Sequence, residues 1–485
     1  MGKPFRSDTA AVTAPPLPRD RVERLEGFGG AAYATGYVYR PVDVSGIRAV
    51  FEVARERGVP VALRGAGRSY GDAAYLSEAI HLDLSRMNRV LSWNPDTGVI
   101  VVEPGVSVRD LWRHVIGDGW LPPVVSGTMF PTIGGALAMN IHGKNHYKTG
   151  TLGDNTAAFD LLLPGSGDVV TCDRTGANRD LFWAAIGGFG VLGVFTAITL
   201  QMMRVSSGLV QVRQVAAKNL RELFVATDTA IAGGADYTVG WVDTFAGGSD
   251  LGRGLVQTAT FLLPGADASP AQSLRADRQD LGDAVLGVPK SVLWRLLKPW
   301  MNDAGMRFLS GVRYKMGAFT SGKTDTETWA GANFLLDYVP GWKKSSGGGG
   351  LIQYQTQIPA DTAHDTFAAQ IRLCHRYRLF PYLSVFKRHR ADDFLMSYSV
   401  DGYSLALDFK VTPQNRDRLW QLAAELDAVT LAAGGRLYFA KDSTAHPSRL
   451  SAFLGETRVA TFRTIKARTD PGNLLQTDLW RRIFG

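Results

Sequence analysis

The sequence predicts an α+β fold of two domains, and three observations lead to this expectation. The 485 residues are too many for one ordinary hydrophobic core. Helical and strand-like hydrophobic periods alternate up to about residue 205, with glycine concentrated at the turns. Residues 206–435 contain segments in which apolar and polar residues alternate, as in an antiparallel sheet with one exposed face. We expect a first domain over 19–205, a second domain over 206–435 with an antiparallel sheet covered by helices, and a C-terminal segment, 436–485, that returns to the first domain.

The elements of the first domain follow from local patterns. Residues 1–18 are rich in Ala, Thr and Pro and are expected to form a flexible tail. Apolar side chains at helical spacing predict a helix over 44–58, which ends at Gly58. The apolar run that follows predicts a buried strand, period-2 runs over 79–108 around Asn-Pro-Asp-Thr-Gly predict a hairpin, and 108–120 predicts a short helix.

The second domain shows strand-like alternation in five segments, separated by helical patterns. The predicted strands are 209–217, 237–245, 255–263, 351–359 and 403–411. Residues 360–378 and 415–435 have helical spacing and are expected to pack on one face of the sheet. The run Ser-Ser-Gly-Gly-Gly-Gly, 345–350, predicts a flexible connection.

Composition excludes several classes of protein. The formal net charge of +8 suits an anionic ligand, a membrane surface or nucleic acid, and solubility alone would also explain it. No charge run or heptad pattern points to nucleic acid. Cys172 and Cys374 offer neither zinc spacing nor a disulfide framework, so we expect no metal site. The N-terminus has no apolar signal-peptide core, and the two long uncharged stretches are interrupted by Pro or Gly, so no transmembrane helix is expected.

Three glycine-dense segments suggest a bound dinucleotide. The first, RGAGRSYGDAAY (64–75), follows a predicted strand, but no helix or Gly-Lys-Ser/Thr sequence follows it, so it is neither a Rossmann nor a Walker loop. Glycine there still lets backbone N–H groups approach an anion, although a plain tight turn explains the loop equally well. Two further segments, 126–155 and 181–200, lie within 140 residues of it. Such a set fits one extended ligand lying along the backbone.

These segments, together with YLSVFKRH, GRLYFAKDS and a late Asp-Pro, resemble decaprenylphosphoryl-ribose 2′-oxidases, flavoproteins of the vanillyl-alcohol-oxidase superfamily. The resemblance runs from about Arg19 to the end and is patchy across 206–350. It implies a two-lobed FAD-binding domain of the p-cresol-methylhydroxylase (PCMH) type, followed by a substrate domain. It also implies FAD, with the diphosphate against the first segment, the flavin ring along the second and the adenine end at the third.

The resemblance assigns residues to the cofactor. Many relatives attach FAD through a His just before the Ser of the first segment or through a Cys in the second. Arg68 and a stretch without Cys occupy those places here, so we expect non-covalent FAD. The cofactor-binding residues that the resemblance implies are Gly65, Ala66, Gly67, Arg68, Ser69, Tyr70, Gly71, Gly127, Thr128, Thr132, Gly134, Gly135, Asn140, Ile141, His142, Gly188, Gly193, Val194, Tyr438 and Lys441.

Four residues are the candidates for catalysis. His142 and Lys144, in NIHGKNH, match positions beside the flavin, where a proton can be shared or an alkoxide stabilised. Lys441 matches a lysine near flavin and substrate, which could polarise the flavin or act as a base. Lys387, in the basic stretch Lys-Arg-His-Arg, suits a phosphate. The structural alternatives are a surface turn for His142 and Lys144, an ion pair with Asp442 for Lys441, and a solvated loop for Lys387.

Five residues are candidates for substrate binding, and some depart from the family. They are Tyr70, Trp241, Gln355, Ser404 and Asp408. Tyr70 and Gln355 would equally serve turn or strand hydrogen bonds, and Trp241 would equally serve a core. The family has Trp-Asn and a Cys where this chain has Tyr403, Ser404 and Ala406, whereas Asp408 is retained. These departures put the sugar or lipid part of the substrate in doubt.

The function expected is oxidation of a secondary alcohol, the ribose 2′-OH, on a polyprenyl-phosphate-linked or otherwise phosphorylated furanose. In the family, an NAD(P)H-dependent short-chain reductase completes an epimerisation used in arabinose and cell-wall biosynthesis. The alternatives are an oxygen-using oxidase of alditols or sugar lactones, and an FAD-binding scaffold without turnover. The expected location is the cytoplasm or the inner face of the plasma membrane, with peripheral membrane contact.

Overall fold

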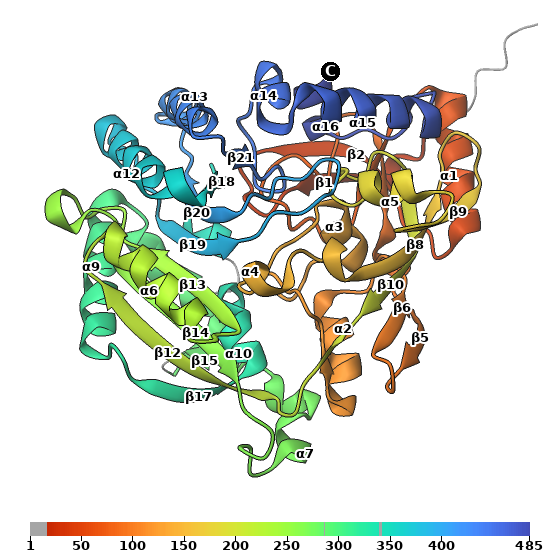
Figure 1. Cartoon of the computed structure of the whole chain (residues 1–485). Coiled ribbons are helices and arrows are strands. Elements are labelled where there is room, and N and C mark those ends of the chain that lie inside the picture. The colour runs from red at the N-terminus through yellow and green to blue at the C-terminus, as the bar shows by residue number, and fades with distance from the viewer. Residues whose placement is uncertain (1–16, 286, 339–341) are drawn as a thin grey trace, which may run out of the picture.

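The computed structural model describes residues 17–285, 287–338 and 342–485 and shows an α+β molecule of two lobes (Figure 1). Most of the tail predicted for 1–18 lies outside the described residues. One lobe carries two sheets formed by strands up to Gln201, and the other carries an eight-stranded sheet. The fold class expected from the sequence is confirmed.

The first lobe contains a four-stranded and a five-stranded sheet. In spatial order, the four-stranded sheet consists of β1 (Val22–Glu26), β2 (Tyr33–Tyr39), β4 (Ile80–Asp83) and β3 (Val61–Arg64). The five-stranded sheet consists of β5 (Val90–Asn94), β6 (Val99–Val102), β10 (Val194–Gln201), β8 (Thr156–Leu162) and β9 (Val169–Asp173). The helices of this lobe are α1 (Val44–Arg57), α2 (Val108–Val115), α3 (Ile133–Ala138), α4 (His146–Thr149) and α5 (Arg179–Ala185).

The first helix forms as its sequence predicts. The Asp43 side chain accepts a hydrogen bond from Gly46 N, which caps the N-terminus of α1. The helix ends at Gly58, whose φ of 59° is left-handed and favours glycine. Ile47 and Phe51 lie on its buried face.

The hairpin predicted over 79–108 is wrong in its first part. Residues 80–83 form β4, which pairs in parallel with β2 and β3 in the other sheet. A short 3₁₀ turn at Leu84–Arg86 interrupts the run, and the antiparallel hairpin is β5–β6 alone. Alternation fixes which residues share a face, but it does not specify the partner strand.

The second lobe is an eight-stranded antiparallel sheet with helices on its outer face. In spatial order its strands are β17 (Thr324–Thr328), β12 (Leu209–Ala217), β14 (Gly254–Phe261), β13 (Tyr237–Val242), β19 (Leu383–His389), β20 (Gly402–Lys410), β18 (Leu351–Pro359) and β21 (Arg436–Leu437). α6 (Leu220–Ala232) packs on β12–β14, and α12 (Ala360–Tyr377) and α13 (Arg416–Ala432) pack on β18 and β20. α9 (Asp303–Phe319) contacts β12 and β14.

The alternation in the central strands does not mark a solvent-exposed face, contrary to the prediction. Every residue of β18 from Leu351 to Ile358 is buried, and so are the first eight residues of β20. Tyr354 points to the helices, where its hydroxyl donates to Asp427 in α13 at 2.9 Å. The polar face, with Gln353 and Gln355, lines an internal cavity. The polar residues that line the cavity therefore produce the same alternating sequence pattern as residues that face solvent.

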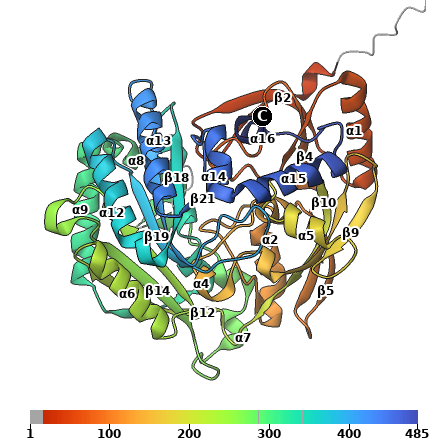
Figure 2. The ribbon, with the colours of Figure 1, turned by 45° about the horizontal axis from the view of Figure 1, so that its top comes forward.

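The chain returns to the first lobe after β21. α14 (Leu450–Leu454), α15 (Glu456–Thr469) and α16 (Asp478–Phe484) lie across that lobe (Figure 2). The backbone of Val61 in β3 bonds to Leu474 and Gln476. Arg482 forms ion pairs at 2.8 Å with Asp72 and with Asp442.

The remaining helices connect strands of the second lobe. They are α7 (Pro270–Ser273), α8 (Lys290–Leu297), α10 (Trp329–Asn333) and α11 (Trp342–Ser345). The connection expected over 345–350 is packed at both ends, because Ser346 is buried and a Cβ on Gly349 would lie 2.1 Å from Val411 O, while Gly347 and Gly348 between them are exposed. Glycine is needed here for close packing of backbone.

Candidate active site

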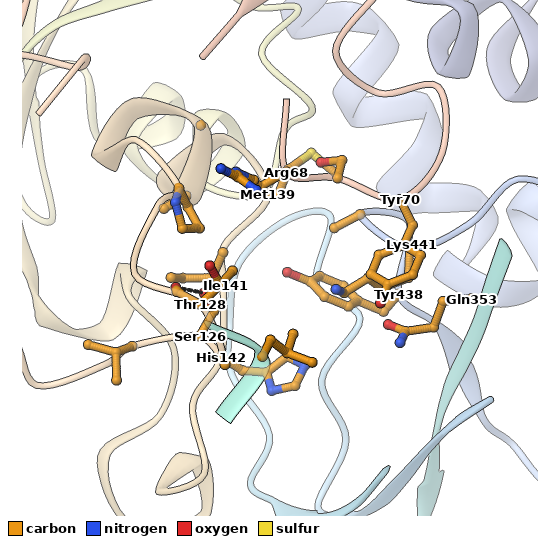
Figure 3. A pocket seen from close by; sticks show the side chains of 18 of the residues that line it. Arg68, Tyr70, Ser126, Thr128, Met139, Ile141, His142, Gln353, Tyr438 and Lys441 are labelled. Atoms are coloured by element: carbon orange, nitrogen blue, oxygen red, sulfur yellow. Dashed lines mark hydrogen bonds between the residues drawn. The ribbon is translucent and has the colours of Figure 1, made fainter. Parts of the chain in front are cut away.

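A cavity of about 580 Å³ lies where the two lobes meet. The first two glycine segments form one wall, and the inner face of the eight-stranded sheet forms another. Residues 438–441 complete it. Figure 3 shows Tyr70, Tyr438, Lys441 and Gln353 on one side and Thr128 and Ile141 on the other. Its size is in the range of cofactor and small-molecule sites.

Most residues predicted to bind the cofactor line this cavity. They are Gly65, Ala66, Gly67, Arg68, Ser69, Tyr70, Gly127, Thr128, Thr132, Gly134, Gly135, Ile141, His142, Tyr438 and Lys441. Phe189, Gly190 and Phe195 also line it, at positions next to predicted ones in the third segment. The sequence prediction missed them because glycine density does not show which residue of a turn faces inward.

Five predicted cofactor residues do not reach the cavity wall. A Cβ on Gly71 would lie 1.9 Å from Asp442 O, and one on Gly188 would lie 2.3 Å from Ala184 O. Gly193 similarly abuts Leu161, and Val194 is fully buried in β10. Asn140 has a φ of 44° and accepts a hydrogen bond from Gly153 N at 2.9 Å. These residues allow close packing behind the wall.

The glycine-lined wall fits an extended dinucleotide. A Cβ on Gly65 would lie 2.1 Å from Thr132 Oγ1, and one on Gly134 would lie 2.6 Å from Pro104 Cβ. Gly67 has a φ of 61°. At these positions the neighbouring side chains leave no room for a Cβ, so a ligand in the cavity meets glycine backbone there.

Lys441 belongs to a buried polar network at the other end of the cavity. Its Nζ lies 4.3 Å from the centroid of the Tyr70 ring. The Tyr70 hydroxyl donates to Asp408 Oδ2 at 2.9 Å, and Gln353 Nε2 donates to the other Asp408 oxygen. Burial raises the pKa of Asp408 to about 6, and burial lowers the pKa of Lys441 to about 8 although Asp408 opposes it. Asp408 therefore acts behind the wall, through Tyr70 and Gln353.

Lys144 and Lys387 bring two more amines to the cavity. Burial lowers the pKa of each to about 7, with nearby Lys387 adding to the effect on Lys144 and Lys441 adding to that on Lys387. Lys144 Nζ donates to Ala332 O. Together with Arg64, Arg68 and Arg313, the three lysines give the lining its positive charge, and the described lining contains no Asp or Glu.

Three imidazoles pack against one another at steep angles beside these amines. The His142 and His389 ring centroids are 4.8 Å apart, and those of His146 and His389 are 4.5 Å apart. His142 Nε2 lies 2.9 Å from Gln355 Nε2, and His389 Nε2 lies 2.7 Å from Ser404 Oγ. Burial first, and then neighbouring cations or imidazoles, lower the pKa of His142 and of His389 well below the usual value. Both rings are therefore neutral and serve as hydrogen-bonding groups.

All predicted catalytic and substrate residues except Asp408 line the cavity. Trp241, Gln355, Lys387 and Ser404 project from the sheet face, and Trp241 stacks under Arg313 with 4.5 Å from Cζ to the ring centroid. Sequence reasoning missed Arg313, because this residue lies outside the motifs that carry the family resemblance.

The fold and the site define an FAD-dependent oxidoreductase. Residues 35–173 match the family model of an FAD binding domain. Over 469 residues, 95% of this chain and 97% of the relative, the sequence is 27% identical to a decaprenylphosphoryl-beta-D-ribose oxidase of Mycolicibacterium smegmatis. The resemblance that the motifs indicated is thereby confirmed along nearly the whole chain.

Two other relatives match only part of their length. An L-gulonolactone oxidase of Mus musculus is 29% identical over 163 residues, 34% of this chain and 36% of the relative. A D-lactate dehydrogenase of Anaerostipes hadrus is 30% identical over 162 residues, 32% of this chain and 34% of the relative.

The described residues contain neither a membrane-spanning helix nor a metal-binding cluster. Within the described ranges, no helix has the length and apolar character needed to span a bilayer. Among the same residues, no cluster of three or more His, Cys, Asp and Glu side chains could hold a metal ion.

Proposed function

We propose that this enzyme oxidises a secondary alcohol, the 2′-hydroxyl, of a phosphorylated or polyprenyl-phosphate-linked ribofuranose. The observation that carries the proposal is the charge of the cavity, which collects three lysines and Arg313 with no carboxylate among its described lining residues. An anionic substrate fits such a wall, because no carboxylate on the described part of the wall competes with it for these cations. The full-length similarity to a decaprenylphosphoryl-beta-D-ribose oxidase supports the sugar.

The chain's own residues can bind the substrate and manage its proton. Bound FAD supplies a hydride acceptor for the alcohol carbon. The amines of Lys144 and Lys387, with pKa values of about 7, exist in both protonation states near neutrality. A charged amine holds the phosphate, and a neutral amine can accept the hydroxyl proton. Gln355, which contacts His142, offers an amide to orient the ring hydroxyls.

The first test is an anaerobic absorbance titration of the FAD-loaded enzyme with a polyprenyl-phospho-ribose. Loss of the flavin band near ~450 nm would show that this sugar reduces the cofactor. An unchanged band with this sugar, but bleaching with an alditol or a sugar lactone, would contradict the proposal and favour the second candidate. Matching release of hydrogen peroxide would identify oxygen as the acceptor in that case; the L-gulonolactone oxidase relative motivates this comparison.

Substitution of Lys387 tests the phosphate contact. Lys387→Ala should raise the KM for a phosphorylated sugar much more than the KM for its neutral counterpart, because an amine on the cavity wall is lost. Arg390→Ala is a matched control, since Arg390 is exposed and pairs with Asp154. Equal effects of Lys387→Ala on both sugars would remove Lys387 from the phosphate site.

We also propose that FAD is held without a covalent bond. Cys172 and Cys374 are buried outside the cavity, and Arg68 stands at the position of the attachment histidine in relatives. Acid denaturation should therefore release the flavin into the supernatant. Flavin that precipitates with the protein would refute this part of the proposal.

The physiological setting follows from the same substrate. A keto-sugar product calls for an NAD(P)H-dependent reductase as the next enzyme, which would complete an epimerisation. A lipid-linked substrate calls for peripheral contact with the inner face of the plasma membrane, which sedimentation with anionic liposomes at low salt would test. An FAD-binding scaffold would instead show no flavin reduction by any sugar.

A further inference from the structure

A second hollow adjoins the active-site cavity. This groove, of about 480 Å³, is bounded by α9, by Gln214 of β12 and by Leu255 of β14. Its described lining residues are Gln214, Leu255, Leu309, Val312, Arg313, Met316, Gly317, Phe319 and Thr320. Gln214, Leu255 and Arg313 also line the active-site cavity, so the two spaces are neighbours with these residues between them.

The groove opens onto an unusually apolar surface. Phe308, Val312, Met316 and Phe319 recur at intervals of three and four residues along α9 and therefore share one face of the helix. Phe308 is 57% exposed, Met316 67% and Phe319 84%. Trp300, also exposed, stacks on Phe308 with 5.7 Å between ring centroids. A contiguous apolar patch of this kind marks a binding surface more often than chance.

Arg313 stands at the junction of the two spaces. Its guanidinium stacks on Trp241 from the sheet, and no carboxylate within the described part of the chain forms an ion pair with it. The Arg313 side chain is exposed and lines both hollows. A stacked guanidinium without an internal counter-ion is suited to bind an anionic group of a ligand.

We infer that the groove along α9 binds the apolar chain of the enzyme's own substrate, with Arg313 joining Lys387 in binding the phosphate. This inference rests on the proposed function and locates the part of the substrate that the family resemblance leaves open. The sugar then occupies the lysine-lined cavity, the anion lies between Lys387 and Arg313, and the chain leaves along Val312, Met316 and Phe319. The order of the three environments matches that of sugar, phosphate and hydrocarbon in a lipid-linked sugar.

The test measures binding of n-alkyl phosphates to the oxidised, FAD-loaded enzyme, through changes in flavin absorbance or displacement of a reporter sugar phosphate. Ethyl, octyl and dodecyl phosphate are used below their micellar concentrations. We expect affinity to rise at least ~30-fold from ethyl to dodecyl phosphate, because each methylene enters an apolar groove. The double variant Met316→Ser/Phe319→Ser should reduce this gain to less than ~3-fold while leaving ethyl phosphate binding unchanged.

Two further variants separate the anion contact from the chain contact. Arg313→Met should weaken binding of every alkyl phosphate by about tenfold, irrespective of chain length. Leu263→Ser alters another exposed apolar residue, 77% exposed and outside the groove lining, and should leave the chain-length gain intact.

Several results would overturn the inference. They are an absence of binding by the whole series, equal affinity across it, or an undiminished chain-length gain in the double variant. If the double variant instead lost only its binding to phosphatidylglycerol vesicles, or only a dimer seen by light scattering, α9 would be a membrane or subunit contact and not a substrate groove. Bleaching of the flavin by a short-chain phospho-ribose is scored separately, so the proposed function can stand when the groove fails, and the reverse also holds.

Discussion

Arg482 provides the sharpest test of how the cofactor lobe is held together. It lies in α16, three residues before Gly485, yet it neutralises Asp72 in the first glycine segment and Asp442 next to Lys441. The Asp442 side chain is 1% exposed and that of Asp72 is 16% exposed, so both carboxylates depend on this guanidinium. Arg482→Met keeps much of the side-chain volume and removes the charge.

The size of the expected effect follows from burial. Removal of one partner from a buried ion pair costs about 3–5 kcal/mol, because the remaining charge is left in a poorly solvated site. The Arg482 side chain is 23% exposed, so water can partly enter, and we expect a loss of about 2–4 kcal/mol in the free energy of unfolding. FAD affinity should fall as well, since Asp442 adjoins the Lys441 wall.

The assay is urea denaturation of the FAD-free protein, followed by titration of the folded variant with FAD. The matched control is Arg468→Met, because Arg468 also comes from a C-terminal helix and pairs with an aspartate, Asp180, but both side chains are largely exposed. The control should change stability by less than about 1 kcal/mol. Equal losses in both variants would refute the claim that burial decides the strength of the Arg482 contacts.

Four further predictions concern the site. Gly65→Ala should weaken FAD binding at least ~10-fold because its Cβ would lie 2.1 Å from Thr132 Oγ1, whereas Gly117→Ala, at an open position, should be neutral; equal FAD titrations would contradict this. Ser404→Ala should reduce the free energy of unfolding, measured in urea, by about 1–3 kcal/mol, because His389 Nε2 loses its hydrogen-bond partner at 2.7 Å. An unchanged free energy of unfolding would show that the His389–Ser404 hydrogen bond contributes nothing to stability. In the folded protein the pKa values of Lys144 and Lys387 are about 7, below the value of lysine in an unfolded chain. Between pH 7 and 10 the unfolded chain therefore binds more protons, and these two groups should make the free energy of unfolding rise with pH. Lys387→Met should diminish this rise in urea titrations. The same deprotonation should raise the KM for a sugar phosphate from pH 6 to 8, and a flat KM would argue against amine contacts to the phosphate.

The sequence predicted the parts of the fold that depend on local patterns. The helix ending at Gly58 and the alternating strands of the second lobe are present because periodicity and caps are local properties. The partner of β4 was not predicted, because strand pairing is decided by contacts distant in sequence. The buried polar face of β18 was mistaken for a solvent face, because polar residues that line a cavity alternate with apolar ones in the same way as residues that face bulk water.

The candidate site was predicted mainly from the family motifs. They named the lysines and His142, which the structure brings to one cavity. They did not identify Arg313, which lies outside any motif and reaches the site only through the packing of α9 on β12 and β14. They also did not predict that Asp408 lies outside the cavity lining and contacts it only through its hydrogen bonds with Tyr70 and Gln353.

The cavity wall is built from residues far apart in the chain, and this sets the order of events during biosynthesis. A ribosome has released the glycine segments long before it reaches Tyr438 and Lys441, and Arg482 emerges last of all. The nascent FAD-binding lobe therefore leaves the ribosome with an open cofactor groove and an unpaired edge on β3. Since the wall is complete only with residues 438–441 and their Arg482 contact, tight binding of FAD requires the C-terminal segment to have been made.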